Sequence, residues 1–208
     1  MKITRYEDIS GLCKDMMKEI GSIGTGNAAT SLSKMLQAEV NMEVPNVDIL
    51  GFTDAVYHLG DPEEMVCCVL ARLEKGINGM MLFLLKMDFI NEILRRTLGK
   101  EIEDYSQMGE LEISAVTEIG NIIISSYILS MSNLVGIQID ISVPVVGINM
   151  LGGILSVPMA EIGQISDKIF MIQGKCTIGG QDMESNVMFL PDIDSLNFLM
   201  DRLVRPYE

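Results

Sequence analysis

The feature that most constrains this chain is a motif that occurs twice at a fixed spacing. Residues 15–45 and residues 114–144 each contain the tripeptide Glu-Ile-Gly, and each segment ends in the dipeptide Val-Pro. Corresponding positions are displaced by 99 residues throughout, as in Pro45 and Pro144. A constant displacement over a segment of this length indicates two copies of one unit, so the fold must accommodate both.

Each copy has the same predicted order of elements. The first copy, at about residues 8–99, reads as a long helix, strands and a short helix, and the second, at about residues 107–205, repeats that order. The long helices are expected at 8–36 and 109–133. The apolar segments between the helices are short and are linked mostly by turns rather than by crossover helices, which favours antiparallel strands.

The expected strands are, in chain order, 40–44, 47–52, 65–72, 78–85, 137–150, 152–158, 168–176 and 184–190. Pro45 should mark an edge, a break or a bulge, because proline cannot donate to the ladder. The fold class is therefore α/β, of the α+β type. Two helix–strands–helix units related by a pseudo-twofold axis form a single domain over residues 1–208, with one mostly antiparallel sheet and both long helices on one face.

The helix ends carry recognisable signals. Asp8 or Ser10 is expected to cap the first long helix, and Asp88 and Asp194 are expected to cap the two short helices. Gly99 should end the first short helix. Three glycines in the first long helix would let it approach another helix or the sheet closely, namely Gly21, Gly24 and Gly26.

The charge balance limits the kinds of partner. A formal net charge of −14 disfavours nucleic acid and anionic membranes as partners. Between Lys100 and Lys168 the chain has nine carboxylates and neither Lys nor Arg. This block is either a solubility feature or a surface for a basic partner, and the sequence leaves both interpretations open.

Residues 119–139 carry no charge and are long enough to cross a bilayer. Seven polar side chains interrupt them and no Lys or Arg flanks them, so we expect a buried helix followed by a strand, without membrane insertion. The N-terminus has no apolar signal core, and a cytoplasmic location is expected. Four cysteines without ligand spacing and a single histidine predict no metal site.

The motif places polar residues along one side of each long helix. At helical spacing these are Ser114, Glu118 and Asn121 in the second copy and Asp15, Glu19 and Ser22 in the first. An amide can orient a water molecule toward an electrophile and bind phosphoryl oxygens, and a nearby carboxylate can bind a cation. Such a stripe can complete another protein's active site but cannot form a whole one. A solvated helix face has the same pattern, and spacing alone leaves both interpretations open.

The pattern Asp/Ser-x3-Glu-x2-Asn-x22-Pro resembles the signature of the CheC, CheX and FliY family of chemotaxis CheY-phosphate phosphatases. The second copy matches this pattern at every position from Ser114 to Pro144. The first copy matches it except at Ser22, where the pattern requires asparagine. The similarity extends over essentially the whole chain.

The resemblance implies that the chain removes the phosphoryl group from the phospho-aspartate of the response regulator CheY. It assigns to Glu118 the contact with the active-site lysine of the receiver, and to Asn121 the positioning of the attacking water. It implies no cofactor of the chain's own, since the acyl phosphate and Mg²⁺ belong to the receiver, and it implies the receptor deamidase CheD as a second partner. Because serine lacks the amide, the site of Glu19 and Ser22 is expected to be weak or inactive.

Two other functions remain open at this stage. A non-catalytic adaptor that holds CheY-phosphate or CheD is favoured by Ser22 and disfavoured by the intact pair of Glu118 and Asn121. A flagellar switch component similar to FliY is expected to need a further C-terminal domain, and the chain ends soon after its last predicted helix.

Overall fold

The computed structural model describes residues 11–162 and 168–204. The elements of the first half are α1 (Gly11–Leu36), β1 (Val40–Gly51), α2 (Phe52–Leu59), β2 (Met65–Lys75), β3 (Gly79–Leu85) and α3 (Met87–Leu98). A short 3-10 turn at Tyr105–Gln107 precedes the second half. The elements of that half are α4 (Glu110–Val135), β4 (Asp140–Ile141), β5 (Val145–Met150), α5 (Leu151–Ile162), β6 (Lys168–Ile178), β7 (Gln181–Pro191) and α6 (Ile193–Val204).

The strands form one sheet in the order β1-β6-β7-β3-β2-β4, with β5 also paired to β2. Every pairing among the described strands is antiparallel, which confirms the predicted sheet. The central strands β3 and β7 come from different halves and pair around Leu82 and Met188. The outer strands are exchanged between the halves, because β1 pairs with β6 and β5 pairs with β2. Each half therefore completes the sheet of the other.

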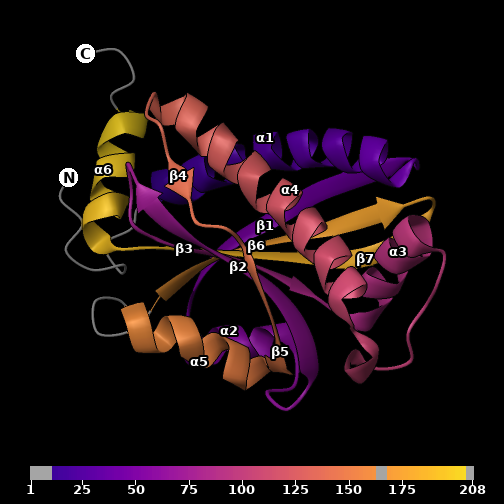
Figure 1. The fold of residues 1–208 in the computed structure, drawn as a ribbon. Coiled ribbons are helices and arrows are strands. Elements are labelled where there is room, and N and C mark those ends of the chain that lie inside the picture. The colour runs from indigo at the N-terminus through magenta and orange to yellow at the C-terminus, as the bar shows by residue number, and fades with distance from the viewer. Residues whose placement is uncertain (1–10, 163–167, 205–208) are drawn as a thin grey trace.

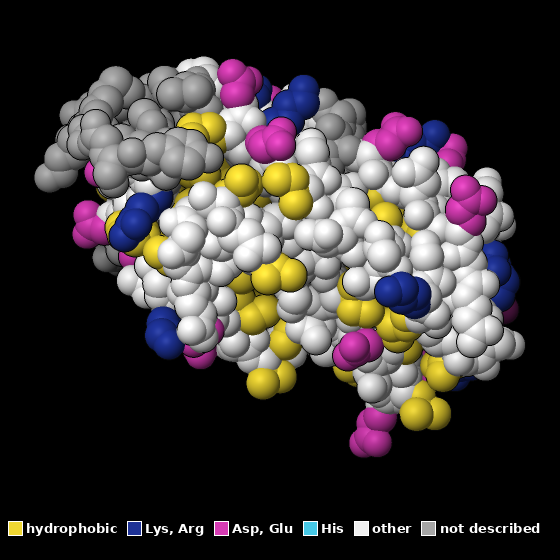
Figure 2. All heavy atoms as spheres, turned by 90° about the horizontal axis from the view of Figure 1, so that it is seen from above, with side chains coloured by type: hydrophobic (Ala, Val, Ile, Leu, Met, Phe, Trp, Pro, Cys, Tyr) yellow, Lys and Arg dark blue, Asp and Glu magenta, His cyan; other side chains and the backbone are white. Residues whose placement is uncertain are grey.

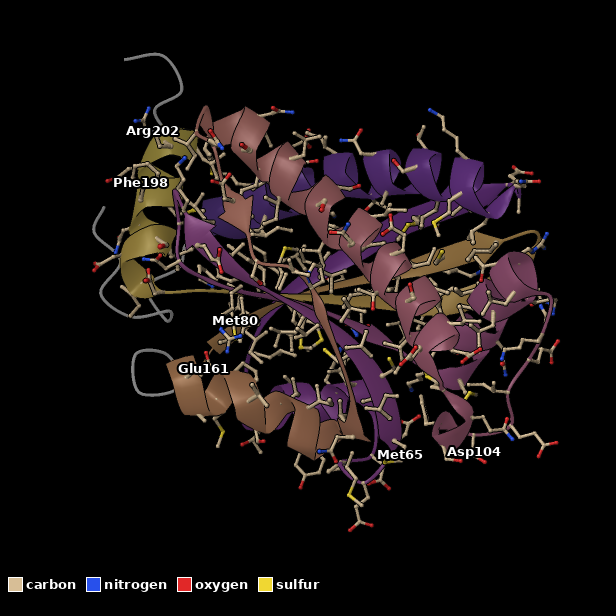
Figure 3. All side chains as sticks on the ribbon, viewed as in Figure 1. Met65, Met80, Asp104, Glu161, Phe198 and Arg202 are labelled. Carbon is tan, nitrogen blue, oxygen red and sulfur yellow. The ribbon has the colours of Figure 1, made fainter. Side chains whose placement is uncertain are left out.

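Helices cover both faces of the sheet (Figure 1). The helices α1, α3, α4 and α6 pack on one face, and α2 and α5 pack on the other. Alternate residues of β2 serve the two cores, so that Cys67 and Val69 face the α1–α4 layer while Val66 and Cys68 face the α2–α5 layer. Met80 of β3 points toward the α5 side (Figure 3). Both long helices lie on one face, as the sequence predicts.

The two long helices touch through small residues. A Cβ atom on Gly24 would lie 3.0 Å from the Tyr127 Cα, so this glycine permits the close crossing of α1 and α4. The hydroxyl groups of Thr25 and Tyr127 lie 3.1 Å apart at this crossing and are buried. Gly26 differs, because a Cβ atom there would meet nothing within 4 Å. The expectation of close approach is thus confirmed for Gly24 and wrong for Gly26.

One predicted strand is wrong. Residues 152–158 are not a strand but part of α5. The run is short and apolar, and such runs have no periodicity that separates a buried helix from a buried strand. In the structure the buried side chains recur at helical spacing, at Leu151, Ile154, Leu155 and Pro158.

The predicted caps are partly wrong. The N-cap of α3 is Lys86, and Asp88 lies in the first turn. Before α6, the Asp192 Oδ1 accepts a hydrogen bond from the Ser195 backbone N–H at 2.7 Å, so Asp192 rather than Asp194 caps this helix. Gly99 ends α3 in the left-handed conformation with φ 68°, as predicted. The proposed caps Asp8 and Ser10 lie outside the described residues.

The motif prolines interrupt the two outer strands. Between Glu43 and Asn46 the register of β1 against β6 shifts, at the position of Pro45. In the second half the corresponding strand is divided, and Pro144 lies in the gap between β4 and β5. Both prolines therefore lie at sheet edges, where the missing N–H is tolerated.

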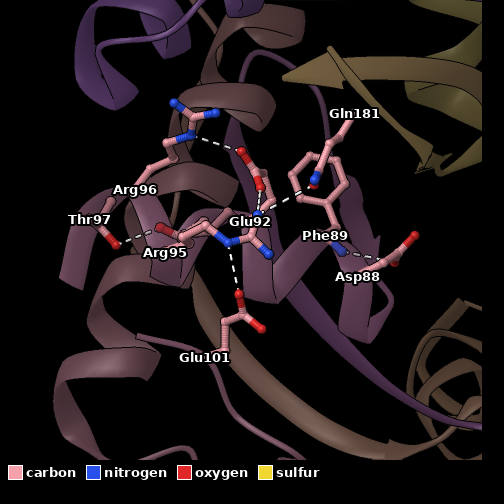
Figure 4. A network of polar contacts seen from close by, with 9 residues as sticks. Asp88, Phe89, Glu92, Arg95, Arg96, Thr97, Glu101 and Gln181 are labelled. Atoms are coloured by element: carbon pink, nitrogen blue, oxygen red, sulfur yellow. Dashed lines mark hydrogen bonds and ion pairs between the residues drawn. The ribbon is translucent and has the colours of Figure 1, made fainter. Parts of the chain in front are cut away.

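A network of polar contacts around a buried carboxylate links α3 to the start of β7 (Figure 4). Glu92 is 1% exposed and forms ion pairs with Arg95 and with Arg96, whose Nε lies 2.8 Å away. Arg95 also binds Glu101 at 2.8 Å and reaches the Gln181 side chain of β7 at 3.4 Å. The charge on Glu92 is compensated by two cations, which a buried carboxylate requires.

Candidate functional site

The second motif lies on the exposed side of α4. Ser114 and Glu118 are exposed, and Asn121 is half-buried. The opposite side of this helix is fully buried against the sheet and α1, through Val116, Ile119 and Ile123. The helix thus presents one carboxylate and one amide to solvent, one turn apart.

The functional groups of this stripe are largely unengaged. The Asn121 Oδ1 accepts a hydrogen bond from the Ser125 hydroxyl at 3.3 Å, and the Asn121 Nδ2 has no hydrogen-bond partner among the described residues. Glu118 takes part in none of the ion pairs formed within residues 11–162 and 168–204. Within the described residues, the Glu118 carboxylate and the Asn121 Nδ2 are therefore available to an incoming molecule.

The first motif occupies the equivalent side of α1, where Asp15, Glu19 and Ser22 are all exposed. The Ser22 hydroxyl donates to the backbone carbonyl of Lys18 at 2.9 Å. This bond turns the hydroxyl back onto its own helix. The Ser22 side chain is shorter than that of asparagine, and its hydroxyl is already bonded to the Lys18 carbonyl.

The start of α4 is fixed by a pair that the sequence interpretation missed. Glu112 is 4% exposed, accepts the Gly109 backbone N–H at 2.8 Å and forms an ion pair with Lys100. The Lys100 ammonium lowers the pKa of the Glu112 carboxyl below its usual value. A glutamate three residues after the N-cap is a capping-box signal, which could have identified Glu112. Lys100 lies 12 residues away, and no local pattern marks it.

The structure brings together only part of the motif. The two stripes lie on neighbouring helices, which contact each other through Thr25 and Tyr127 and through Asn27 and Ser130. Pro45 in β1 and Pro144 between β4 and β5 lie at opposite edges of the sheet. The prolines therefore shape the sheet and do not extend the polar stripe.

Two negative expectations can be compared with the described residues. Within residues 11–162 and 168–204, no group of three His, Cys, Asp or Glu side chains could hold a metal ion. The helix α4 is long and apolar enough to cross a bilayer, and half of its most apolar stretch is buried inside the fold. That burial agrees with the predicted core helix.

Comparison with known proteins finds similarity to one family in both halves of the chain. The model of the CheC-like family matches residues 13–49 and 111–148, one segment in each half. The chain is 28% identical over 189 residues to the CheY-P phosphatase CheC of Bacillus subtilis, covering 89% of this chain and 90% of that protein. It is 30% identical over 149 residues to the flagellar motor switch phosphatase FliY of the same organism, covering 69% of this chain and 37% of FliY.

A solved structure has the same fold. The crystal structure of Thermotoga maritima FliY matches with a TM-score of 0.76 at 24% identity, over 96% of this chain and 100% of that one. The fold, the two family matches and the nearly full-length similarity to CheC agree with one another. Both halves of this chain are similar to the CheC-like family, and nearly the whole chain is similar to CheC.

Proposed function

We propose that this chain is a protein-aspartyl-phosphate phosphatase that acts on the phosphorylated response regulator CheY. The proposal is supported by its similarity to a CheY-P phosphatase over nearly its whole length. The observation that carries it is the solvent-facing pair on α4, in which Glu118 and the Asn121 Nδ2 lack partners among the described residues. We assign no nucleophile paired with a base to that stripe, so this chain is not proposed to form a covalent intermediate. The acyl phosphate is then the one carried by the partner.

The proposed reaction is hydrolysis of the acyl phosphate within the receiver. A water oxygen attacks phosphorus, the bond from phosphorus to the aspartyl oxygen breaks, and inorganic phosphate leaves the restored carboxylate. The Asn121 amide accepts a hydrogen bond from the water and donates one to a phosphoryl oxygen, which holds the water in line. Glu118 binds the lysine of the receiver site and fixes the register of the two proteins. The receiver supplies Mg²⁺, and no cofactor is assigned to this chain.

Sustained turnover separates the phosphatase from a non-catalytic adaptor. With the chain present at a concentration far below that of CheY-phosphate, we expect phosphate release to continue over many equivalents per chain. A stoichiometric adaptor instead would change the decay only in proportion to the complex formed. Absence of any acceleration at catalytic concentration would exclude the phosphatase and leave the adaptor.

The first motif is proposed to be weak, and the Ser22→Asn substitution tests this. An amide at position 22 restores the missing group on an exposed helix face, so the rate should rise, to at most about twofold if both sites then act independently. The measurement is the rate of CheY-phosphate decay at fixed chain concentration. The matched variant is Ser22→Ala, which removes the bond to the Lys18 carbonyl and should leave the rate unchanged. A loss of activity in Ser22→Ala would assign a catalytic role to the serine.

Two further assignments rest on the family resemblance. We propose CheD as a second partner and the cytoplasm as the location, and we assign no docking position for CheD. Co-purification of this chain with CheD, in the presence and absence of CheY-phosphate, tests the partnership. No binding under either condition would remove CheD from the proposal.

A further inference from the structure

Two exposed leucines lie on the same side of α4 as the proposed catalytic pair. Leu111 is 68% exposed and Leu129 is 54% exposed, although both are large apolar side chains. They precede and follow Glu118 and Asn121 along the helix. Figure 2, which looks onto the face that carries α1 and α4, shows hydrophobic side chains reaching the surface in separate groups.

The leucines lie beside the catalytic stripe, close in direction to Glu118 and about 80° around the helix axis from Asn121. Leu111 and Leu129 are 18 residues apart, which is about five complete helical turns. At about 100° per residue, both leucines lie roughly 20° from the direction of Glu118 around the helix axis. The stripe therefore has an apolar group at each end and the carboxylate–amide pair between them.

The spacing fits the footprint of one protein partner. With a rise of about 1.5 Å per residue, Leu111 and Leu129 lie about 13 Å and 14 Å along the axis from the midpoint of Glu118 and Asn121. A standard interface covers about 800 Å² on each protein, which corresponds to a disc with a radius of about 16 Å. A domain centred on the catalytic pair would thus cover both leucines.

The corresponding side of α1 has the same residue type at the equivalent of Leu111, which is Leu12, but differs at two other positions. At the equivalent of Leu129, α1 has Thr30, whose hydroxyl donates to the Gly26 carbonyl at 3.0 Å. At the equivalent of Thr117, α1 has the exposed Lys18, whereas α4 has neither Lys nor Arg anywhere along its length. Among the side chains that the structure describes in α1 and α4, an exposed leucine C-terminal to the motif occurs only in α4, and α4 has no Lys or Arg.

We propose that Leu111 and Leu129 are docking residues that seat the phosphorylated receiver on the catalytic pair of α4. The partner is then a receiver domain that exposes apolar side chains on both sides of its phospho-aspartate pocket. A receiver with basic side chains on both sides of that pocket would place charges against Leu111 and Leu129, and it is therefore not the partner that we propose. This inference rests on the proposed function, because it takes the same receiver as the occupant.

The inference predicts a change in binding and not in chemistry. Leu129→Thr introduces the residue that α1 has at this position, and Leu111→Ser removes the other leucine. Each substitution should raise the KM for CheY-phosphate about 5- to 30-fold, because the lost contact is made equally in the ground state and the transition state. The kcat should stay within about twofold of the unsubstituted value, because Glu118 and Asn121 are unchanged. Leu129→Met, which retains the apolar surface, should restore the KM.

The matched control is Tyr57→Ala. Tyr57 is 70% exposed and belongs to α2, on the opposite face of the sheet, so the KM should not change. A KM for Leu111→Ser and Leu129→Thr equal to that of Tyr57→Ala would overturn the docking role. If the unsubstituted chain turns over and Asn121→Ala does not, the proposed function survives that result. If neither the unsubstituted chain nor Asn121→Ala accelerates the decay of CheY-phosphate, the proposed function is wrong. The affinity of the leucine variants for the receiver, measured directly, then decides the docking role by itself.

Discussion

Replacement of Asn121 by alanine is expected to lower the rate of CheY-phosphate hydrolysis about 10²- to 10³-fold. The loss corresponds to the removal of one well-placed hydrogen-bonding group from a transition state, which costs about 2.7–4 kcal/mol. The Asn121 Oδ1 has only the Ser125 hydroxyl as a partner and its Nδ2 has none among the described residues, so its free groups are the ones lost. The kcat should fall, and the KM should change little, since binding depends on the surrounding surface.

The same substitution should leave the fold intact. Asn121 is half-buried on the outer side of α4, and alanine is the strongest helix former, so the free energy of unfolding should not fall. A matched pair of measurements on Asn121→Ala and Ser22→Ala decides between one active site and two. Equal losses of activity in the two variants would contradict a single dominant site.

The duplicated motif predicted much of the fold but not how its halves join. Short apolar segments separated by turns carry the information for antiparallel pairing, and this part was confirmed. The exchange of β1 and β5 between the halves depends on contacts between residues 75 or more positions apart, such as Leu70 with Val145 and Val40 with Ile178. Nothing in the local pattern distinguishes this arrangement from strands paired within each half. Sequence periodicity records which face of a strand is buried, but it does not record the neighbour.

The candidate site was likewise predictable from the sequence only in part. Helical spacing was enough to place Ser114, Glu118 and Asn121 on one exposed stripe. The state of the Ser22 hydroxyl was not predictable, because serine in a helix can face solvent or bond to the carbonyl four residues earlier. The roles of these residues in hydrolysis remain predictions that the variants above test.

Replacement of Gly120 by alanine is expected to destabilise the protein and to disturb the catalytic pair together. Gly120 lies in α4, directly before Asn121, and rests on Val69 of β2. A Cβ atom on Gly120 would lie 2.5 Å from the Val69 Cβ and Cγ2 and 2.6 Å from its Cγ1. Three contacts this short cannot be relieved by rotating one side chain, because the Val69 Cβ is fixed to the strand.

Two opposing effects decide the sign of the stability change. Alanine favours a helix over glycine by about 1 kcal/mol. Overpacking of a well-packed core costs about 1–3 kcal/mol, and the contacts at Val69 place Gly120→Ala at the upper end. The net loss should be about 2 kcal/mol, which lowers the Tm by about 4–8 °C for a chain of this size. Thermal unfolding followed by circular dichroism measures this shift.

Gly26→Ala is the matched control within the same fold. Gly26 also lies in a long helix, but a Cβ atom there would meet nothing within 4 Å. Only the helix-forming effect remains, so Gly26→Ala should stabilise the protein by up to about 1 kcal/mol. If both variants were stabilised, the close contact of α4 with β2 would be wrong.

The effect of Gly120→Ala on activity follows from the same contact. If α4 moves outward to admit the methyl group, Asn121 moves with it, and a displacement of about 1 Å in a catalytic group can cost up to 10²-fold in rate. Val69→Ala removes two of the three short contacts and keeps the one to the Cβ at position 69, so the double variant should recover only part of the stability and the rate. Recovery of stability without recovery of rate would mean that the position of Asn121 does not depend on how α4 rests on the sheet. Recovery of both would make the glycine of the Glu-Ile-Gly tripeptide the residue that sets the height of the catalytic stripe above the sheet.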